Sequence, residues 1–548
     1  MAKQILYKEK ARNALFRGVD IVANAVKITL GPRGRNAVLD KGYGTPTITN
    51  DGVSIAREIT LKDKFENMGA EIVKEVASKT NDNAGDGTTT AIIITQAIIE
   101  EGVRQTAMGV NAMGIRLGIE AGAKAVVEEL KKMAKPIKSH EEIVQVANIA
   151  AESSEVGKII ADTIKKVGKD GVVTVEESQS FGVEAEFVEG LQFDKGYLSP
   201  YMITDGERME AEYKDTSILI TDKKISSVKE ILPLLEKIAA TGRKELVIIA
   251  EDVDGEALTT FVLNMLRGAF KVLAIKAPGY GDRKKELLQD IAITVGGTVV
   301  SDETGMTLEK ADLGTLGHSQ KVIASKDDTI IVGGKGKKSD IEARINQLKT
   351  QKKNSDSKFD TEKLDERIAK LSGGVAIIKV GAATESEMKY LKLKIEDAVN
   401  ATKAAIDEGI VAGGGVALIK AAEKVASKNL KSPNGNFAKE FEVGVNLVLS
   451  ALSIPLKQIA INAGKDDGAV IVEKVKEGKG NYGYDALAGT FVADMIVAGI
   501  VDPVKVTRLG VENAASAAAI LLTTEVAITD EPKEEKEVGG GAPGMGGY

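Results

Sequence analysis

The chain has two Ala-rich helical ends separated by a middle region of different character. Apolar residues recur at helical spacing over 65–130 and again over 385–525. Between these blocks, short β-branched runs such as SILIT (217–221) and ELVIIA (245–250) alternate with helical segments. That alternation is typical of a parallel or mixed sheet flanked by helices. The similar ends therefore predict one discontinuous helical domain, into which the middle region is inserted.

Length and composition limit what kind of protein this is. A chain of 548 residues is too long for one hydrophobic core, so two to four domains are expected. Because there is no Cys, disulfides, thiolate catalysis and Cys-based zinc sites are excluded. With only two His, His140 and His318, a His-rich metal centre or a Ser-His-Asp triad is not expected.

Charge and hydropathy bear on partners and location. The net charge is −7 and no basic block stands out, which argues against nucleic acid as the main partner. The N-terminal stretch MAKQILYKEKARNALF lacks the apolar core of a signal peptide. No apolar run looks long enough to span a bilayer. We therefore expect a cytoplasmic protein without a membrane partner.

Several shorter elements are expected within this framework. Residues 11–30 predict a helix that Gly31-Pro32 ends, and residues 37–56 predict a β-hairpin. The highly charged stretch 338–370 predicts a solvent-facing helical pair, followed by a strand at 375–380. The acidic and then Gly-rich tail is expected to be disordered.

The stretch GDGTTT, residues 85–90, carries the most chemical information. A Gly-rich turn at a helix start exposes backbone N–H groups, and the helix dipole favours an anion such as phosphate there. A carboxylate beside phosphate needs a cation between them, so Asp86 reads as a Mg²⁺ ligand. The three Thr hydroxyls can donate to phosphate oxygens. The alternative, that Asp86 and Thr88 only cap a helix, stays open.

Three other Gly-containing motifs have simpler explanations in isolation. TLGPRGRN (29–36) can be a helix C-cap, TNDG (49–52) a hairpin turn, and IVAGGGVAL (410–418) a close helix contact. No Walker A pattern occurs anywhere in the sequence. A GxGxxG string at 478–483 follows a charged, helix-like stretch rather than a strand, so it is expected to be a loop and not a dinucleotide fingerprint.

Taken together, these motifs carry a specific resemblance. TLGPRGRN, ITNDGVSIA, NDNAGDGTTTA, GYLSPYM, KAPGYGDRKKELLQDIA, EGIVAGGGVAL and a Gly- and Met-bearing tail all occur in the chain. They closely resemble the bacterial and organellar class of chaperonins, the 60 kDa GroEL type, from Lys3 to the tail. The archaeal and eukaryotic-cytosolic class, which has a built-in lid, is a weaker match because of the GYGDRKKELLQDIA segment and the tail.

The resemblance implies a multi-domain, GroEL-like fold. It comprises a mainly α-helical equatorial domain with small β-hairpins, an α/β intermediate hinge domain and an α/β apical domain. The implied bounds are 1–134 and 408–526 (equatorial, ATPase), 135–189 and 374–407 (intermediate), 190–373 (apical, binding substrate and co-chaperonin) and 527–548 (disordered tail).

The implied activity is ATP hydrolysis coupled to protein folding. Such a chaperone captures non-native polypeptides and encloses them under a GroES-type co-chaperonin. The implied cofactors are ATP, Mg²⁺ and K⁺. The implied assembly is a tetradecamer of two stacked heptameric rings.

The resemblance also assigns a nucleotide site residue by residue. Asp86 would hold Mg²⁺, while Asp51 and Asp397 would orient and activate the attacking water. Asp397 would reach the site only when its domain swings, so hydrolysis would be gated by a hinge; without the resemblance, Asp397 reads as a surface helix acid. The remaining nucleotide contacts would be Thr29, Leu30, Gly31, Pro32, Asn50 (where some relatives have Lys), Gly87, Thr88, Thr89, Thr90, Gly414, Asp485, Ala486 and Asp502.

A polypeptide- and co-chaperonin-binding face is implied in the apical domain. Its residues would be Tyr197, Tyr201, Met202 (where an aromatic residue is often found), Leu232, Leu235, Leu258, Val262 and Leu263. Helical periodicity places Leu232 off the stripe of Ile231, Leu234, Leu235 and Ile238, and Leu263 off the stripe of Leu258, Phe261, Val262, Met265 and Leu266. Off-stripe Leu residues can form an exposed apolar rim. A broad, fully buried helix is the alternative that periodicity alone favours.

Two other classes of function compete with this one. A metabolic phosphotransferase would need a small-molecule pocket, for which the sequence offers no motif. A binding protein that has lost ATPase activity is disfavoured because Asp51, Asp86 and Asp397 are all present.

Overall fold

The computed structural model describes residues 2–40, 46–168, 171–178, 180–206, 208–354, 357–435 and 437–531. It divides into two compact units. The described parts of 1–39, 49–134 and 411–548 form the first unit, and those of 40–48 and 135–410 form the second. Both chain ends thus belong to one unit and the middle to the other, whereas the finer division of the middle into two domains stays a prediction.

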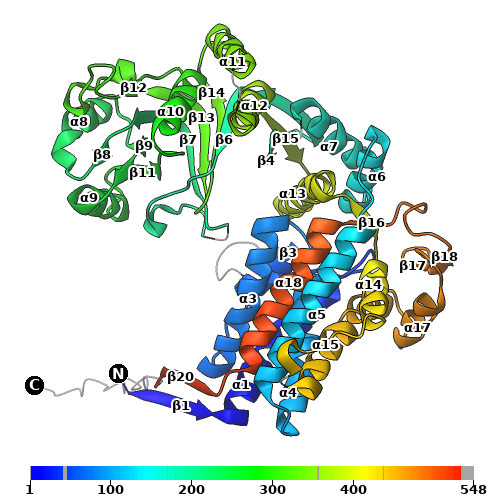
Figure 1. Ribbon diagram of the computed structural model, residues 1–548. Coiled ribbons are helices and arrows are strands. Elements are labelled where there is room, and N and C mark those ends of the chain that lie inside the picture. The colour runs from blue at the N-terminus through cyan, green and yellow to red at the C-terminus, as the bar shows by residue number, and fades with distance from the viewer. Residues whose placement is uncertain are drawn as a thin grey trace, which may run out of the picture. The chain divides into compact units, whose positions relative to one another are not determined.

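The first unit is a bundle of long helices (Figure 1). Its main helices are α1 (Lys8–Val26), α3 (Lys64–Ala84), α4 (Thr88–Ala107), α5 (Ala112–Met133), α14 (Val416–Ala426), α15 (Ala438–Ala451) and α18 (Val504–Leu522). Shorter helices are α2 (Gly52–Glu58), α16 (Ile454–Asn462), α17 (Ala469–Glu477) and the 3-10 turn η1 (Lys27–Thr29). One core joins both chain ends: residues of α1, α3, α4 and α5 pack with residues of α14, α15 and α18.

Local sequence explains where these helices begin and end. Asp63 caps α3, because its side chain accepts the Phe65 and Glu66 N–H groups at 2.8 and 3.0 Å. The helix ends at Gly85, whose φ of 69° is left-handed. Buried small residues, such as Ala514 and Ala518 of α18, let the helices approach closely.

Four short strand pairs are also present among the described residues. They are β1 (Lys3–Tyr7) with β20 (Val526–Asp530), β2 (Ala37–Leu39) with β3 (Thr47–Thr49), β16 (Ile410–Ala412) with β19 (Val501–Pro503), and β17 (Gly483–Asp485) with β18 (Thr490–Val492). The pairing of β2 with β3 confirms a strand pair within the hairpin predicted over 37–56. The prediction is wrong from Gly52 onward, where α2 begins because Asp51 caps that helix. Residues 41–45 lie outside the described residues.

The two chain ends are held together by β1 and β20. These strands pair antiparallel in the register Lys3↔Asp530 to Tyr7↔Val526, and Lys3 Nζ lies 2.6 Å from Asp530 Oδ1. The expectation that the tail is disordered from residue 527 is therefore wrong for 527–530. The β-branched residues of this stretch complete a two-stranded ladder instead. The remainder, 532–548, lies outside the described residues.

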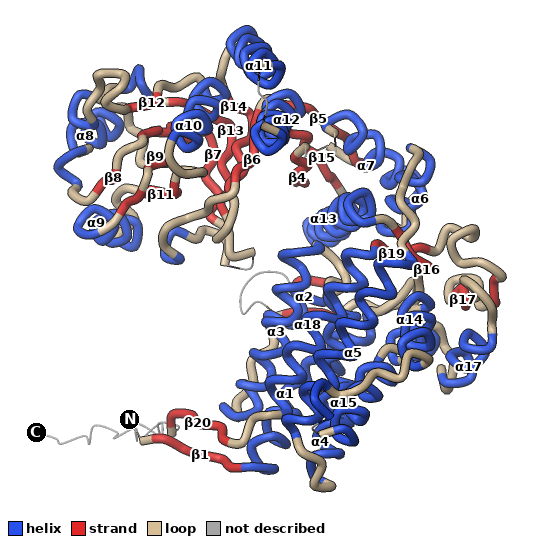
Figure 2. Tube along the Cα trace, viewed as in Figure 1, coloured by secondary structure: helices blue, strands red, loops and turns tan. Residues whose placement is uncertain are grey.

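The second unit is built on a seven-stranded sheet (Figures 1 and 2). The strand order is β11-β9-β7-β13-β14-β6, and β12 also pairs with β7. The strands are β6 (Gly190–Phe193), β7 (Ala211–Thr221), β9 (Glu245–Ala250), β11 (Lys271–Lys276), β12 (Val299–Val300), β13 (Gly317–Ala324) and β14 (Thr329–Gly334), with β8 (Lys224–Ile225) and β10 (Asp252–Val253) as a separate pair. Helices α8 (Leu232–Ala240), α9 (Gly255–Leu266) and α10 (Asp282–Val295) contribute to its core. The predicted alternation of strands and helices is confirmed.

A smaller sheet lies in the same unit. Its order is β4-β15-β5, formed by Val172–Glu177, Val375–Gly381 and Gly182–Val188. Helices α6 (His140–Ala151), α7 (Ser154–Val167) and α13 (Glu385–Glu408) share one apolar cluster with it. Residues before and after the large sheet therefore meet in one small layered body.

The predicted charged helical pair is present as α11 (Lys338–Lys353) and α12 (Lys358–Gly373). It is tied to α10 by ion pairs to the buried Asp290 and the half-exposed Glu286. Asp290 accepts from Arg344 Nε at 2.8 Å and from Arg367 Nε at 2.7 Å, while Glu286 accepts from Arg344 Nη2 at 2.7 Å and from Arg367 Nη2 at 3.1 Å. The pair is thus not purely solvent-facing, since its inner side is fixed by charge.

Contrary to the expectation from the sequence, one stretch of the described residues is long and apolar enough to pass for a membrane span. It is Ala438–Asn462, with a mean hydropathy of 1.5 over its best window, of which 56% is buried. The stretch is two core helices, α15 and α16, separated near Ser453. Buried core helices are also long and apolar enough, so this feature is weak evidence for a membrane span.

Candidate functional site

In the first unit the N-termini of α2 and α4 meet. Asp51 caps α2 by accepting the Val53 and Ser54 N–H groups at 3.1 and 3.0 Å. Gly87, with a φ of 83°, precedes α4, and no side chain caps that helix. A Cβ added at Gly52 would lie 2.4 Å from Thr89 Oγ1. Two helix starts are therefore in contact at the GDGTTT motif, where backbone N–H groups and dipoles favour an anion.

The end of η1 lies against the same helix start. Thr29 Oγ1 is 3.3 Å from Thr89 Oγ1, and both side chains are buried. Asn462 at the end of α16 donates its amide to the Leu30 carbonyl at 2.8 Å. The TLGPRGRN and GDGTTT motifs, which look unrelated in the sequence, thus share one site. Gly31 and the exposed Pro32 follow in the loop after η1.

Three carboxylates influence one another here. Burial, and then the charge of Asp51, raise the pKa of Asp86, although the Gly87 N–H bond opposes this shift. Burial, and then the charge of Asp86, raise the pKa of Asp502 to about 7, although the backbone N–H groups of Gly414 and Gly415 bond to it. Both side chains keep partial solvent contact. The site therefore concentrates negative charge that a cation would relieve.

The residues fit a magnesium–nucleotide complex. Among the described residues, no group of three or more His, Cys, Asp or Glu side chains is arranged to hold a metal alone. Mg²⁺ in nucleotide sites uses one or two carboxylates together with phosphate oxygens, so a full protein cage is not required. Asp86 supplies such an oxygen, and the uncapped start of α4 supplies N–H donors beside it.

Residues expected at the base and ribose connect to the same region. Asp485 of β17 accepts the Leu487 and Ala488 N–H groups at 2.9 and 3.0 Å. Arg33, from the loop after η1, donates to the Leu487 carbonyl at 2.7 Å. Ala486 is buried in an apolar cluster against which Leu30 packs. Asn50, Gly87, Thr90 and Gly414 are partly exposed, and Thr88 is buried.

Asp397 belongs to the second unit. It lies on α13, where Ile395, Ala398 and Val399 are buried and Asp397 itself is partly exposed. Because the first unit holds the other nucleotide-site residues, the catalytic role of Asp397 stays a prediction.

The expected polypeptide-binding residues are mixed in exposure. Tyr201, Leu232 and Leu263 are 65%, 43% and 46% exposed. Tyr197, Leu235, Leu258 and Val262 are partly buried. Met202 is completely buried in the sheet core, so its assignment to an exposed face is wrong in this structure. Leu266, expected on the buried stripe of α9, is 65% exposed because it ends that helix.

The sequence of residues 22–532 matches the TCP-1/cpn60 chaperonin family. The chain belongs to this family. Membership supports a chaperone role in protein folding. The family is ATPase-active, and its members form oligomeric rings that act on client proteins.

Some residues that shape the chaperonin's site were not found from the sequence. Asn462 donates to the Lys27 and Leu30 carbonyls at 2.9 and 2.8 Å, and no sequence pattern signals this role. Gly52 belongs to the TNDG motif, but its close approach to Thr89 was not predicted. These contacts join residues that lie far apart in the sequence, so no local pattern reveals them.

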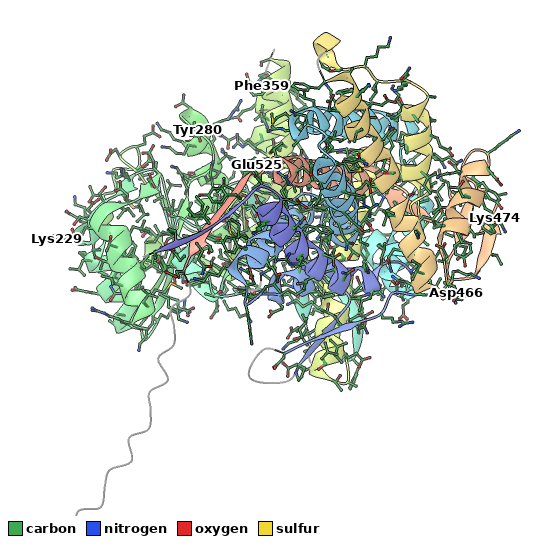
Figure 3. The ribbon with its side chains drawn as sticks, turned by 90° about the horizontal axis from the view of Figure 1, so that it is seen from below. Lys229, Tyr280, Phe359, Asp466, Lys474 and Glu525 are labelled. Carbon is green, nitrogen blue, oxygen red and sulfur yellow. The ribbon has the colours of Figure 1, made fainter. Side chains whose placement is uncertain are left out.

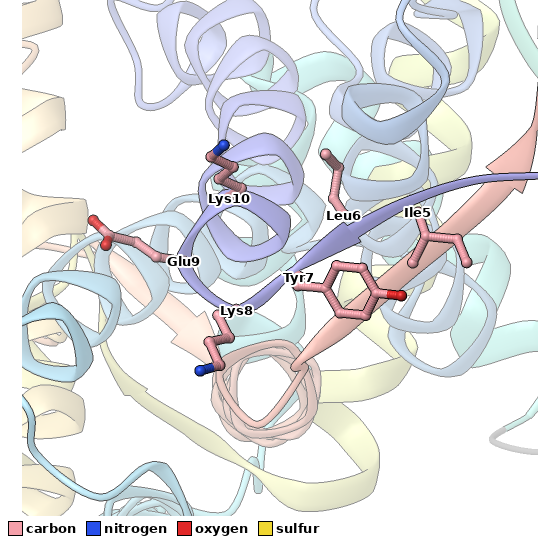
Figure 4. Close-up of a pocket in the computed structure, with 6 residues that line it drawn as sticks. All are labelled: Ile5, Leu6, Tyr7, Lys8, Glu9 and Lys10. Atoms are coloured by element: carbon pink, nitrogen blue, oxygen red, sulfur yellow. The ribbon is translucent and has the colours of Figure 1, made fainter.

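Two surface hollows lie away from these motifs. One of about 460 Å³ is lined by Ile5–Lys10 at the junction of β1 and α1 (Figure 4). Another of about 590 Å³ lies between α4 and α15. Neither contains a carboxylate or hydroxyl of the nucleotide-site motifs, so neither is the candidate site.

Proposed function

We propose that this chaperonin is an ATP-dependent folding machine of the bacterial and organellar type. It captures non-native polypeptides and encloses them under a GroES-type co-chaperonin. The observation that carries the proposal is the contact between the starts of α2 and α4, which brings Asp51 and the GDGTTT motif together. Family membership supplies the chaperone role.

The nucleotide would bind along the loop after η1 and the start of α4. Thr88, Thr89 and Thr90, with the α4 N–H groups, would donate to phosphate oxygens, and Asp86 would hold Mg²⁺. The metal would neutralise phosphate charge, as in other phosphoryl transfers. Asp485, Ala486 and Asp502 would contact the base and ribose. A K⁺ ion is proposed as a second cation.

Hydrolysis would depend on two further carboxylates. Asp51 would orient the attacking water from the first unit, and Asp397 would join it when α13 moves. Positioning of this kind supplies most of the rate gain in phosphoryl transfer. ATP turnover would therefore follow the hinge motion.

The client would be held by apolar side chains of the seven-stranded sheet's helices, chiefly the exposed Tyr201, Leu232 and Leu263. We further propose two stacked seven-membered rings acting in the cytoplasm, with neither nucleic acid nor membrane as partner. The net charge of −7 is in keeping with a cavity wall that does not bind unfolded chains tightly.

The test is the yield of a guanidinium-denatured enzyme refolded with this protein, Mg-ATP and a GroES-type co-chaperonin. Recovery should require both additions and fall sharply in Asp397→Ala, whereas Glu385→Gln on the same helix should retain it. Capture without recovery would indicate a holding role. ATP hydrolysis with neither capture nor recovery would contradict the proposal and favour a small-molecule phosphotransferase.

A further inference from the structure

An ion pair in the second unit links the large sheet to the helix that carries Asp397. Arg208 Nη2 donates to Glu396 Oε2 at 2.5 Å, across 188 residues of sequence. Both side chains are largely shielded, with exposed fractions of 32% and 22%. A charged hydrogen bond so placed is stronger than one on an open surface.

Arg208 is fixed to the seven-stranded sheet. Its own N–H bonds to Asp205 Oδ1 at 3.2 Å. Asp205 and Glu210 exchange two backbone hydrogen bonds, of 2.9 and 3.1 Å, and β7 begins at the next residue, Ala211. The guanidinium therefore moves with the sheet, because the turn that carries it is closed at its base.

Glu396 is fixed to the smaller layered body. Its neighbours Ile395, Ala398 and Val399 are buried against the cluster shared with α6, α7 and β15. Asp397 follows Glu396 directly on the same rigid helix, so any displacement of Glu396 also displaces Asp397.

The surroundings of Arg208 are acidic, so its charge is needed there. Burial acts to lower the pKa of Arg208, but the charge and hydrogen bond of Glu396, and then the charges of Glu210 and Asp205, outweigh it and raise the pKa above its ordinary value. Burial raises the pKa of Glu210 to about 7, and Arg208 opposes that rise. Removing the guanidinium would leave these carboxyls facing one another and push the turn away from α13.

We propose that Arg208 is a positioning residue for ATP hydrolysis, which acts through Glu396 to restrain the helix that carries Asp397. This proposal rests on the proposed function, because the restraint would lower the rate of the hinge-dependent ATP hydrolysis described above. The Arg208–Glu396 ion pair would thus couple the sheet that binds clients to the helix that carries the proposed catalytic carboxylate. Breaking the pair should free α13 and speed turnover, while nucleotide binding stays unchanged.

Steady-state ATPase of the full chain tests the restraint. Arg208→Gln and Glu396→Gln should each raise kcat by roughly 5-fold or more, within the range of typical coupling between sites, with KM unchanged. The double variant should gain no more than either single variant, because both remove the same contact. Arg208→Lys should fall back toward the parent rate, and Glu385→Gln, which alters only an ion pair within α13, should match it. Unchanged kcat, additive gains or a shift in KM alone would overturn the proposal.

A second measurement does not depend on ATPase activity. Hydrogen–deuterium exchange without nucleotide should increase in Arg208→Gln at both the turn before β7 and the first half of α13, and it should not increase in Glu385→Gln. Faster exchange in the turn alone would overturn the restraint. Loss of ATPase in the parent, or activity that survives Asp397→Ala, would contradict the proposed function instead, and the exchange result would still decide whether the restraint exists.

Discussion

The side-chain oxygens of Thr29 and Thr89 lie 3.3 Å apart, although the residues are separated by 60 positions in the chain. This contact joins the end of η1 to the first turn of α4. Each of the two motifs can be explained alone as a helix terminus. Because of this contact, both line one candidate anion-binding site. The predictions for the first unit follow from this arrangement.

Asp86→Asn should abolish Mg-ATP binding but should not destabilise the nucleotide-free protein. The carboxylate is the proposed metal ligand, and its charge is already disfavoured by burial and by Asp51. We expect hydrolysis to fall by roughly 100-fold or more, as when an essential electrostatic contact is lost. Calorimetric titration with Mg-ATP and thermal unfolding check both points. Asp466→Asn, at the exposed position labelled in Figure 3, is the matched control, and a lower Tm of Asp86→Asn would contradict the argument.

Gly52→Ala should disturb the site through a steric clash. The new methyl group would lie 2.4 Å from Thr89 Oγ1 and 2.8 Å from Thr88 Oγ1. Overpacking of this kind costs about 1–3 kcal/mol, and here it would also push the α4 start aside. Weaker nucleotide affinity with a lower Tm is therefore expected. Gly510→Ala inside α18, where the nearest atom is 3.9 Å away, should be neutral or stabilising.

The stability of the nucleotide-free protein should depend on the protonation of Asp502. Its pKa is raised from 3.8 to about 7, so the folded state holds this proton more tightly than the unfolded chain does. Stability from this group is therefore greatest in acid and declines as pH rises from about 4 to about 7. Tm measured across this window should fall less steeply in Asp502→Asn than in the parent. An equal slope would show that another group dominates.

Asp290→Ala should destabilise the second unit strongly. The buried carboxylate accepts hydrogen bonds from Arg344 and Arg367. Its removal would leave both guanidinium groups beside α10 without this acceptor. Losing one member of a buried charge network costs about 3–5 kcal/mol. Faster amide exchange over α10, α11 and α12, with the first unit unaffected, is the expected readout. Asp365→Ala, which removes an exposed pair with Lys352, should leave exchange in α10 unchanged.

Leu263→Ser should weaken capture of a denatured protein while leaving Tm unchanged, because the side chain is 46% exposed. Met202→Ala should do the reverse, since emptying a fully buried site costs about 2–5 kcal/mol. Light scattering of an aggregating client and thermal unfolding distinguish the two effects. Reduced capture by a stably folded Met202→Ala would place Met202 on the binding face after all.

Hydrophobic periodicity predicted the helices and strands better than it predicted which of their side chains are buried. The helices of both ends and the strands near 217–221, 245–250 and 272–277 carry patterns that a sequence displays directly. For Leu232 and Leu263, periodicity alone favoured a fully buried helix, whereas both side chains are exposed, as the alternative of an apolar rim expected. Met202 lies in a short 3-10 turn, where no helical stripe exists to separate inside from outside, and its neighbour Tyr201 is exposed.

Residue patterns alone predicted the site only as separate motifs, and the family resemblance was needed to assign them to one nucleotide site. Asn462 and Leu30 are bonded across 432 residues, a relation that no local pattern encodes. The tail was misjudged for a similar reason. The stretch at 526–530 becomes a strand only because β1 supplies its partner, so its order depends on the opposite end of the chain.

The first unit is built from two distant parts of the chain, as the pairing of β1 with β20 also shows, and this has a consequence during synthesis. The core of the first unit mixes α1 and α5 with α18, so it cannot close before the ribosome has made α18. Translation of residues 135–410 alone takes on the order of tens of seconds at about 5–20 residues per second. Throughout that interval the nascent α1–α5 segment lacks its apolar partners. Newly made subunits should therefore themselves need a chaperone that binds their exposed apolar surface. Pulse-labelled chains that are released before α18 has been made should aggregate more readily than chains that include it.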